Sequence, residues 1–548
     1  MEDDVGDHGM KASRRGVLGM GAALGAGVAL PRTAHAAELF PVIETAQGKL
    51  RGAQAGDVAT FKGIRYAAPA SGRNRFMPPQ PVAKWAGVRD AFSYSDVSPQ
   101  VPADRRSPYA DLIMFDVQPG GPGEDCLALN LWSPNLSQQA RVPVIVVLHG
   151  GGFYGGSGNS VGMDGEAMAR FSKSVVISVT HRLGAFGFLH LAEAGGSDFA
   201  SSGTVGMQDI VAALRWVREN VASFGGDPDR VLVYGQSGGG AKTSMLLAMP
   251  SAKGLIHRAG VMSGSALRAM PPEIATQRAS ALMKALELGP KDVRKLQDLP
   301  WLTVLKAQAG LEAAARAKGE APGSFAPVVD GVAIPRHPFD PDAPEISADV
   351  PMIISTALDE RAYRMMDFRM DEAGLLAFAR QRAGAKAEEA IKLYRDEDAK
   401  SPPFLIAARM DSDLYFRRGA FAQTELKAKQ GKAPVWSYLW TWPSPAYGGR
   451  FGAVHGIDVA PSLYSVRGGL NGPSASSLKM AERMASIWGA FAANGDPNNA
   501  RIPQWAAYTQ ARRTTLILDD DTRVAENPRR QFRDFWAQNR AATPMAEG

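Results

Sequence analysis

A serine flanked by glycines follows a short apolar segment at residues 231–234. The motif reads Gly235-Gln236-Ser237-Gly238-Gly239, and a helical pattern follows over residues 241–249. Glycines are needed beside the serine because a tight strand-to-helix turn leaves no room for side chains. Such a turn exposes the Ser237 hydroxyl at the N-terminus of a helix, where the helix dipole favours developing negative charge. The spacing therefore predicts that Ser237 is a nucleophile.

The same spacing occurs a second time, at Gly158-Asn159-Ser160-Val161-Gly162. No strand pattern precedes Ser160, and no helix-forming run follows it immediately, so the strand-to-helix context is missing. Short motifs of this kind also match by chance in a glycine-rich chain. We therefore favour Ser237 over Ser160.

A glycine-rich loop follows another apolar segment, at residues 144–148. It reads His149-Gly150-Gly151-Gly152-Phe153. Glycines allow backbone N–H groups to approach a substrate oxygen closely. During acyl transfer the carbonyl oxygen becomes an anion, and fixed donors of this kind stabilise it. The loop therefore predicts an oxyanion hole next to the nucleophile.

A serine hydroxyl needs a base to accept its proton. Of the eight histidines, only His337 and His455 follow Ser237 with room for an acid between, which is the order that this turn motif favours. His337 stands between prolines in a surface-like loop, whereas His455 stands in a loop after the strand pattern at 435–440. We predict that His455 is the base.

The acid should follow a strand between the serine and the histidine. The strand pattern at 352–355 is followed by Asp359 and Glu360. We favour Glu360 and keep Asp359 as the alternative. An ion pair between Glu360 and a surface arginine would be the non-catalytic interpretation.

The elements that must position these residues alternate in type along the chain. Continuous apolar runs of four to six residues suit strands buried on both faces, as in a parallel sheet. Helical patterns lie between them, so the alternation predicts a doubly wound α/β sheet. Two helical segments, at about 271–325 and 361–430, interrupt this alternation of strands and helices, and we interpret them as insertions. We treat residues 37–548 as a single catalytic domain.

Composition excludes several classes of protein. The 548 residues carry 61 lysines and arginines against 55 acids, a net charge of +6, and the charges are interspersed. No basic stripe with interleaved aromatic residues appears, which argues against nucleic-acid binding. The single cysteine, Cys126, excludes an intrachain disulfide and a cysteine metal cage. No apolar run in the body is long enough to span a membrane stably.

The first 36 residues have the pattern of an export signal. Arg14-Arg15 precedes a weakly apolar run over residues 16–30, and Ala34-His35-Ala36 provides a small-residue cleavage site. The paired arginines are typical of twin-arginine export. We expect this segment to be removed and the mature protein to be periplasmic or secreted.

Further segments over nearly all the mature chain resemble motifs of the type B carboxylesterases, in the carboxylesterase/cholinesterase family of α/β-hydrolases. They are Phe61-Lys62-Gly63-Ile64-Arg65-Tyr66-Ala67, Glu124-Asp125-Cys126-Leu127-Ala128-Leu129-Asn130, Phe224-Gly225-Gly226-Asp227-Pro228 and Gly495-Asp496-Pro497-Asn498. The resemblance implies an α/β-hydrolase fold, with a central, mostly parallel, twisted sheet flanked by helices and helical insertions covering the active site. It also supports Glu360 as the acid.

The resemblance assigns further residues by position. The oxyanion donors that it implies are the N–H groups of Gly151, Gly152 and Gly238. It implies structural ion pairs of Arg75 with Glu124 and of Arg182 with Asp209. Two departures bear on the substrate and on the cysteine. The usual glutamate before the nucleophile is Gln236, which argues against cationic choline esters, and Cys126 lacks its usual disulfide partner, so we expect a buried thiol.

The sequence thus predicts an exported serine carboxylesterase with a small-molecule ester substrate and neither a metal nor an organic cofactor. We expect Phe153, Gln236, Met366 and Phe368 to contact that substrate, although packing of an insertion against the core would explain Met366 and Phe368 as well. An amide- or carbamate-cleaving hydrolase is the alternative enzyme, and a non-catalytic adhesion protein on the same fold is the alternative of another class. The sequence does not predict the natural ester or the oligomeric state.

Overall fold

The computed structural model describes residues 39–102, 108–113, 119–318, 325–365, 367–466 and 469–539. The predicted export signal, residues 1–36, lies outside the described residues, and so does Met366.

Eleven strands of the described chain form one sheet, in the order β14-β13-β12-β11-β10-β9-β7-β8-β6-β4-β3. The strands from β7 to β13 pair in parallel, and antiparallel pairs occur only towards the two edges. Their bounds are β3 Ala53–Ala55, β4 Val58–Arg65, β6 Ala128–Ser133, β7 Val142–Leu148, β8 Val175–Val179, β9 Gly226–Gln236, β10 Arg258–Met262, β11 Met352–Ala357, β12 Val435–Trp440, β13 Thr514–Leu518 and β14 Arg523–Glu526. The predicted mostly parallel sheet is confirmed. Strands β1 (Val42–Glu44), β2 (Lys49–Arg51) and β5 (Val88–Asp90) form a small separate sheet.

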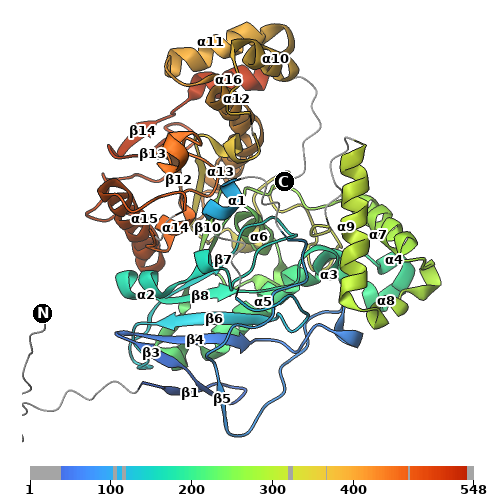
Figure 1. Ribbon diagram of the computed structural model, residues 1–548. Helices are drawn as coiled ribbons and strands as arrows, with labels where there is room; N and C mark the ends of the chain where they lie inside the picture. The colour runs from blue at the N-terminus through green and yellow to red at the C-terminus, as the bar shows by residue number, and fades with distance from the viewer. Residues whose placement is uncertain are drawn as a thin grey trace, which may run out of the picture. The chain divides into compact units, whose positions relative to one another are not determined.

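Helices follow most of the parallel strands, as the alternating pattern predicts (Figure 1). Their bounds are α1 Pro108–Ile113, α2 Glu166–Ser172, α3 Gly184–Phe188, α4 Ala192–Gly195, α5 Val205–Asn220, α6 Gly238–Leu246, α7 Pro272–Ala285, α8 Lys295–Asp298, α9 Trp301–Ala317, α10 Glu372–Ala383, α11 Ala387–Glu397, α12 Pro403–Ser412, α13 Arg418–Gln430, α14 Val459–Ser462, α15 Ala475–Asn494 and α16 Arg530–Gln538. A π-helical turn, η11 (Asp413–Arg417), joins α12 to α13, and a 3₁₀ turn, η9 (Glu360–Tyr363), follows β11.

The sheet is buried on both faces, because alternate residues of its central strands enter two different cores. On β7, Val144 and Val146 belong to a core cluster that includes residues of α5. Ile145 and Val147 belong to a second cluster that includes residues of α15. Successive side chains of a strand point to opposite faces, so an uninterrupted apolar run is what a sheet covered on both sides requires.

Both predicted insertions are helical. Helices α7 to α9 lie within 271–325, and α10 to α13 lie within 361–430. In Figure 1, α10, α11 and α12 gather with the C-terminal helix α16, and α7, α8 and α9 form a group elsewhere on the molecule. Helix α10 contacts α11 and α12, and α11 contacts α16.

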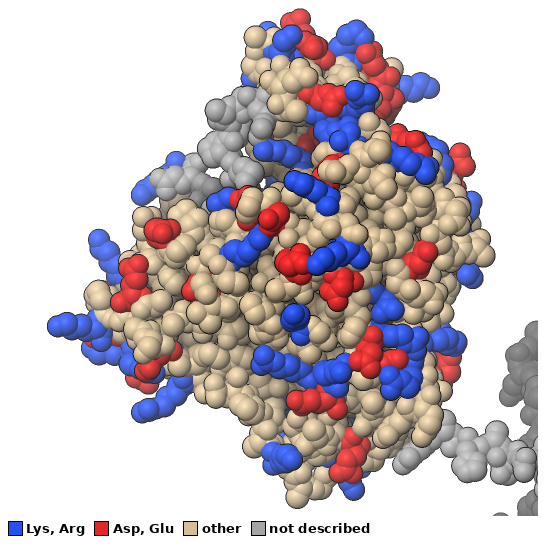
Figure 2. Space-filling model, turned by 180° about the vertical axis from the view of Figure 1, so that it is seen from behind, with Lys and Arg blue, Asp and Glu red and all other residues tan. Residues whose placement is uncertain are grey.

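Charges of both signs are mixed over the face of the molecule seen in Figure 2, where lysine and arginine side chains lie beside aspartate and glutamate. Within the described part of the chain, no helix combines the length and apolar character needed to cross a membrane.

Candidate active site

The predicted nucleophile lies at the sharp turn that joins β9 to α6. Ser237 stands between the last residue of β9 and the first of α6, with φ 56° and ψ −120°. A residue with a side chain rarely adopts positive φ, so the surroundings must hold this strained conformation. The Ser237 N–H donates to the Met262 carbonyl, at the end of β10, at 2.7 Å. The hydrogen bond anchors the turn on the neighbouring strand.

The glycine loop after β7 packs directly against this turn. A Cβ atom on Gly238 would lie 2.2 Å from the Gly152 carbonyl oxygen, so the close approach requires glycine. Among the described residues, no hydrogen bond uses the N–H groups of Gly151 or Gly152. The N–H of Gly238 opens helix α6 and has no intrahelical acceptor. Backbone donors are therefore left available beside Ser237.

The predicted base and acid meet from two loops 95 residues apart in the chain. His455 Nδ1 lies 2.5 Å from Glu360 Oε2, and both side chains are buried, with exposed fractions of 4% and 0%. The other carboxylate oxygen, Glu360 Oε1, accepts the Ala357 N–H at 2.7 Å. A carboxylate at Nδ1 holds the proton on that nitrogen, so Nε2 is left with its lone pair.

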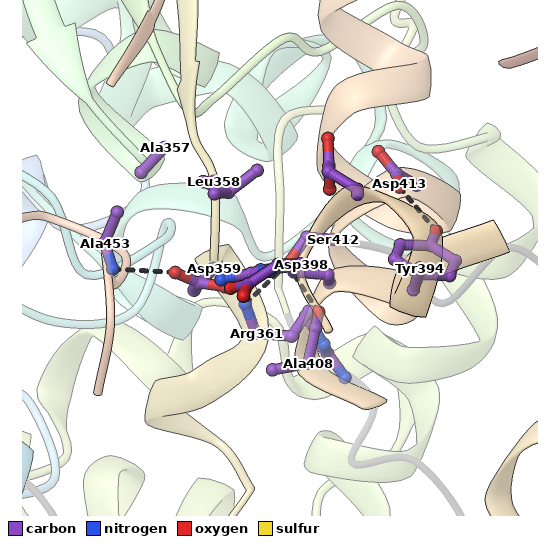
Figure 3. A network of polar contacts seen from close by, with 12 residues as sticks. Ala357, Leu358, Asp359, Arg361, Tyr394, Asp398, Ala408, Ser412, Asp413 and Ala453 are labelled. Carbon is purple, nitrogen blue, oxygen red and sulfur yellow. Dashed lines mark hydrogen bonds and ion pairs between the residues drawn. The ribbon is translucent and has the colours of Figure 1, made fainter. Parts of the chain in front are cut away.

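Asp359, the alternative acid, has a different set of partners. Its Oδ2 accepts the Ala453 N–H at 2.8 Å, and Arg409 Nε donates to its Oδ1 at 2.7 Å. Figure 3 shows Asp359 bridging from its own strand end to the Ala453 backbone. The structure therefore places Glu360 against the histidine, whereas Asp359 joins its own loop to the loop that carries His455.

A contact that the sequence did not predict occupies the other ring nitrogen. Gln236 Nε2 lies 3.1 Å from His455 Nε2, so the amide donates to the lone pair that would take the serine proton. Among the described residues, no hydrogen bond joins the Ser237 hydroxyl to His455. The buried Gln236 Oε1 has no hydrogen-bond partner among them. Gln236 therefore contacts His455 directly, in addition to preceding Ser237 in the chain.

Aromatic rings cover both the ring and the backbone of His455. Tyr363 stacks on the imidazole at 4.9 Å between centroids and an interplanar angle of 19°, and Phe416 lies 4.9 Å away at 51°. The Tyr109 hydroxyl donates to the His455 carbonyl at 2.7 Å. Phe416 belongs to the π-helical turn η11, and no spacing in the sequence connects it to the histidine.

The residues predicted to contact the substrate lie in different environments. Phe153 is buried and packs edge-on against Phe188 in the core, at 5.4 Å. Phe368 packs against Phe404 at 4.7 Å and Phe451 at 5.3 Å, which is the insertion packing kept as an alternative. Met366 lies outside the described residues.

A buried cation supports the glycine loop from behind. Lys242 Nζ, on α6, donates to the His149 carbonyl at 3.0 Å. Burial lowers the pKa of Lys242 to about 7. The His149 and His181 rings stack at 5.0 Å beside it, and burial, with the nearby Lys242 charge as the second cause, lowers the pKa of both well below the usual histidine range. A lone lysine in an otherwise apolar helix pattern is the signal that could have revealed this group.

The remaining predicted residues are found in structural roles. Arg75 pairs with Glu124 and Arg182 with Asp209, each at 2.6 Å, so both implied ion pairs are confirmed. Cys126 is a buried free thiol, as expected, and burial raises the pKa of that thiol.

The two rejected candidates lie outside this turn. Ser160 is buried at the start of a short 3₁₀ turn, with no strand leading into it. His337 is half-buried in a loop, and the described residues bring no carboxylate into contact with its ring. No group of three or more histidine, cysteine, aspartate or glutamate side chains within the described residues could hold a metal ion.

A mostly parallel sheet with a serine at the strand-to-helix turn and a glycine loop beside it defines an α/β-hydrolase. A model of the carboxylesterase family matches residues 40–536. The chain is 32% identical to the para-nitrobenzyl esterase of Bacillus subtilis, over 90% of this chain and 97% of that protein. It is 33% identical to the phenmedipham hydrolase of Pseudarthrobacter oxydans, over 88% and 95%.

Solved structures agree with this assignment. A carboxylesterase of Geobacillus stearothermophilus superposes with a TM-score of 0.76 at 32% identity, over 90% of this chain and 99% of that one. An esterase of Clostridium hathewayi gives the same TM-score at 31% identity, over 91% and 98%. The chain therefore belongs to the carboxylesterase family and is a type B carboxylic ester hydrolase.

Proposed function

We propose that this protein is an exported serine carboxylesterase that cleaves small-molecule esters through Ser237, His455 and Glu360. The observation that carries the proposal is the contact of His455 Nδ1 with Glu360 Oε2, at 2.5 Å, beside the strained turn of Ser237. A nucleophile, a base and a group that orients the base form the arrangement that acyl transfer needs.

In the first half-reaction, His455 Nε2 takes the Ser237 proton as Oγ attacks the ester carbonyl carbon. The carbonyl oxygen receives the displaced electron pair, and the N–H groups of Gly151, Gly152 and Gly238 stabilise the resulting oxyanion. The imidazolium, held by Glu360, then gives its proton to the leaving alcohol as the C–O bond breaks. An acyl group remains on Ser237.

In the second half-reaction, His455 takes a proton from water, whose oxygen attacks the acyl carbon. The same oxyanion forms and collapses, the carboxylic acid leaves, and Ser237 recovers its proton from the imidazolium. Gln236 must release His455 Nε2 before each proton transfer, because its amide occupies the lone pair in the resting arrangement. Neither half-reaction needs a cofactor.

The test is hydrolysis of 4-nitrophenyl acetate by the wild type and by Ser237→Ala. The alanine variant should lose kcat by about 10⁶-fold, as loss of a triad nucleophile does. Ser160→Ala is the matched control and should keep wild-type turnover. Substantial activity in Ser237→Ala would remove this serine from the mechanism.

Amide or carbamate cleavage is the alternative reaction, and paired substrates separate it from ester cleavage. We expect turnover of 4-nitrophenyl acetate and far slower turnover of 4-nitroacetanilide, its amide counterpart. Comparable rates on both would favour the amidase alternative. Absence of turnover on esters, amides and carbamates alike would favour the non-catalytic binding protein.

A further inference from the structure

Arg364 lies directly after the turn that carries the proposed acid. Its Nε–H donates to the Tyr363 hydroxyl at 2.7 Å, and its guanidinium carbon lies 5.3 Å from the centre of the Tyr363 ring. The same ring stacks on His455 at 4.9 Å. The Tyr363 ring therefore contacts both this cation and the proposed base.

The titratable groups that act on the charge of Arg364 are phenols. Tyr363, foremost, and then Tyr154 and Tyr109 raise the pKa of Arg364 through charge interactions. Tyr154 belongs to the glycine loop, since a Cβ atom on Gly152 would meet the Tyr154 ring at 2.6 Å. Tyrosines of three elements at the site, namely α1, the glycine loop and η9, therefore act on the charge of one guanidinium.

No carboxylate of the described residues pairs with this cation, since the charges that act on it are those of tyrosines. Arg364 is exposed to solvent. Two other arginines of this region, Arg361 and Arg409, do not share this property. Arg361 lies 3.8 Å from Asp411, and Arg409 pairs with Asp359 at 2.7 Å. Phenols are neutral at neutral pH, so they leave the charge of Arg364 uncompensated.

We propose that Arg364 binds a carboxylate carried by the substrate, so that the enzyme prefers esters with a second, ionised carboxyl group. A guanidinium offers a planar pair of donors that matches a carboxylate, and aromatic neighbours orient it. The proposal rests on the proposed ester hydrolysis at Ser237 and names the substrate class of that site.

The experiment compares kcat/KM for two matched pairs of esters. The first pair is mono-4-nitrophenyl glutarate and its methyl ester, which differ in charge on the acyl side. The second is 4-acetoxybenzoate and 4-acetoxybenzamide, which differ in charge on the alcohol side. We expect the anion to be preferred by about 10- to 50-fold in at least one pair, as charge-assisted hydrogen bonds allow. Added salt should reduce the preference.

Substitutions of Arg364 test whether this residue causes the preference for anionic esters. In Arg364→Gln the ratio of anionic to neutral kcat/KM should fall towards one. In Arg364→Lys part of the ratio should remain, because a point charge replaces the planar donor pair. Arg369→Gln removes an exposed arginine from the same segment and should leave the ratio unchanged.

Two results would overturn the proposal. One is equal kcat/KM within both pairs, and the other is an anion preference that persists in Arg364→Gln. If no ester is hydrolysed at all, the proposed function fails, and the substrate class fails with it. The two failures are distinguished by activity on the neutral esters alone.

Discussion

At the scale of single residues, the His455 side chain has contacts at both ring nitrogens and with two aromatic rings. Glu360 occupies Nδ1, Gln236 occupies Nε2, and Tyr363 and Phe416 flank the ring. The proposed base is therefore held from several sides, which limits its reorganisation during proton transfer and favours catalysis. Its accepting nitrogen is nevertheless occupied by an amide donor, so Gln236 should influence the pH at which the base works.

Replacing that amide by a carboxylate tests this influence. In Gln236→Glu a negative charge beside the ring would favour the imidazolium, so the base would need a higher pH to lose its proton. We expect the midpoint of the rise of kcat/KM with pH to move up by about 1 unit. Gln54→Glu, far away on β3, is the control for the added charge. An unchanged profile in Gln236→Glu would mean that this side chain does not act on the base.

The sequence predicts the residues of the candidate site but not the further contacts that these residues make. Motif context and chain order favour Ser237, His455 and Glu360, and the family resemblance supports Glu360 as the acid. The Gln236 contact with His455 spans 219 residues, and it exists only because the end of β9 meets the loop that carries His455. No local periodicity carries such information.

At the scale of elements, the second insertion, residues 361–430, forms hydrogen bonds with the segment that holds the proposed acid. Arg417, at the end of the π-helical turn η11, donates to the Ala357 carbonyl at 2.7 Å and to the Leu358 carbonyl at 2.9 Å. On the other side of Glu360, the Arg361 N–H donates to the Ser412 hydroxyl at 3.0 Å. π-helical turns are frequent at functional sites. This one places the Arg417 guanidinium against the end of β11.

Buried partners fix the π-helical turn in place. Figure 3 shows Tyr394 of α11 reaching Asp413, and the hydroxyl donates to the carboxylate at 2.5 Å. Arg529, next to α16, donates to the same carboxylate at 2.9 Å. The helical group of Figure 1 therefore supports the proposed acid through Asp413 and Arg417.

Arg417→Met removes the two hydrogen bonds to the carbonyls while keeping most of the side-chain volume. We expect kcat to fall by about 10- to 100-fold with KM little changed, because the acid would lose its position while the binding surface remains. Arg380→Met, an exposed arginine on α10, is the control. A fall in kcat matched by a large loss of unfolding free energy, measured in urea, would instead indicate a general structural role.

Element types were predictable where packing and local pattern agree. The apolar runs of β7, β8 and β9 predicted strands, because both faces of the sheet are covered. Helix α6 begins at Gly238, three residues before the predicted helix, because close packing against the glycine loop outweighs the poor helix propensity of glycine. The support that the insertion gives to Glu360 depends on tertiary contacts, so composition could not reveal it.

At the scale of the whole molecule, one buried acid makes the stability depend on pH. Burial, with the charge of Glu360 as a second cause, raises the pKa of Asp458 to about 7. Tyr438 donates to its Oδ2 at 2.9 Å, and its Oδ1 has no partner among the described residues. The folded state therefore holds a proton that the unfolded chain loses near pH 4. The stabilisation by this proton is fully present below about pH 4 and is lost as the pH rises to about 7.

Asp458→Asn removes this dependence, since asparagine does not titrate and still accepts the Tyr438 hydrogen bond. The gain in unfolding free energy over the wild type should grow between pH 4 and pH 7 and reach about 4 kcal/mol at pH 8. Urea unfolding at pH 4.5, 6 and 8 measures it. A gain that is the same at all three pH values would contradict a titrating Asp458.

The proposed export route concerns the chain as a whole. Replacing Arg14 and Arg15 by lysines should leave the uncleaved precursor in the cytoplasm, because the arginine pair is the feature that distinguishes twin-arginine export. Fractionation and an immunoblot of precursor and mature protein measure this. Replacing Arg105 and Arg106 by lysines is the matched control outside the signal. Normal export of the signal double variant, with cleavage after residue 36, would point to general secretion instead.

The central claim, that Ser237 is the nucleophile of an esterase, is tested most directly by covalent labelling. A fluorophosphonate reacts with an activated serine, forming an O–P bond as fluoride leaves, whereas an ordinary buried serine does not react. Peptide mass spectrometry of the labelled protein should find one adduct, on Ser237, formed in step with the loss of esterase activity and absent after heat denaturation. Stoichiometric loss of activity with the adduct on Ser160 or any other residue would contradict the account.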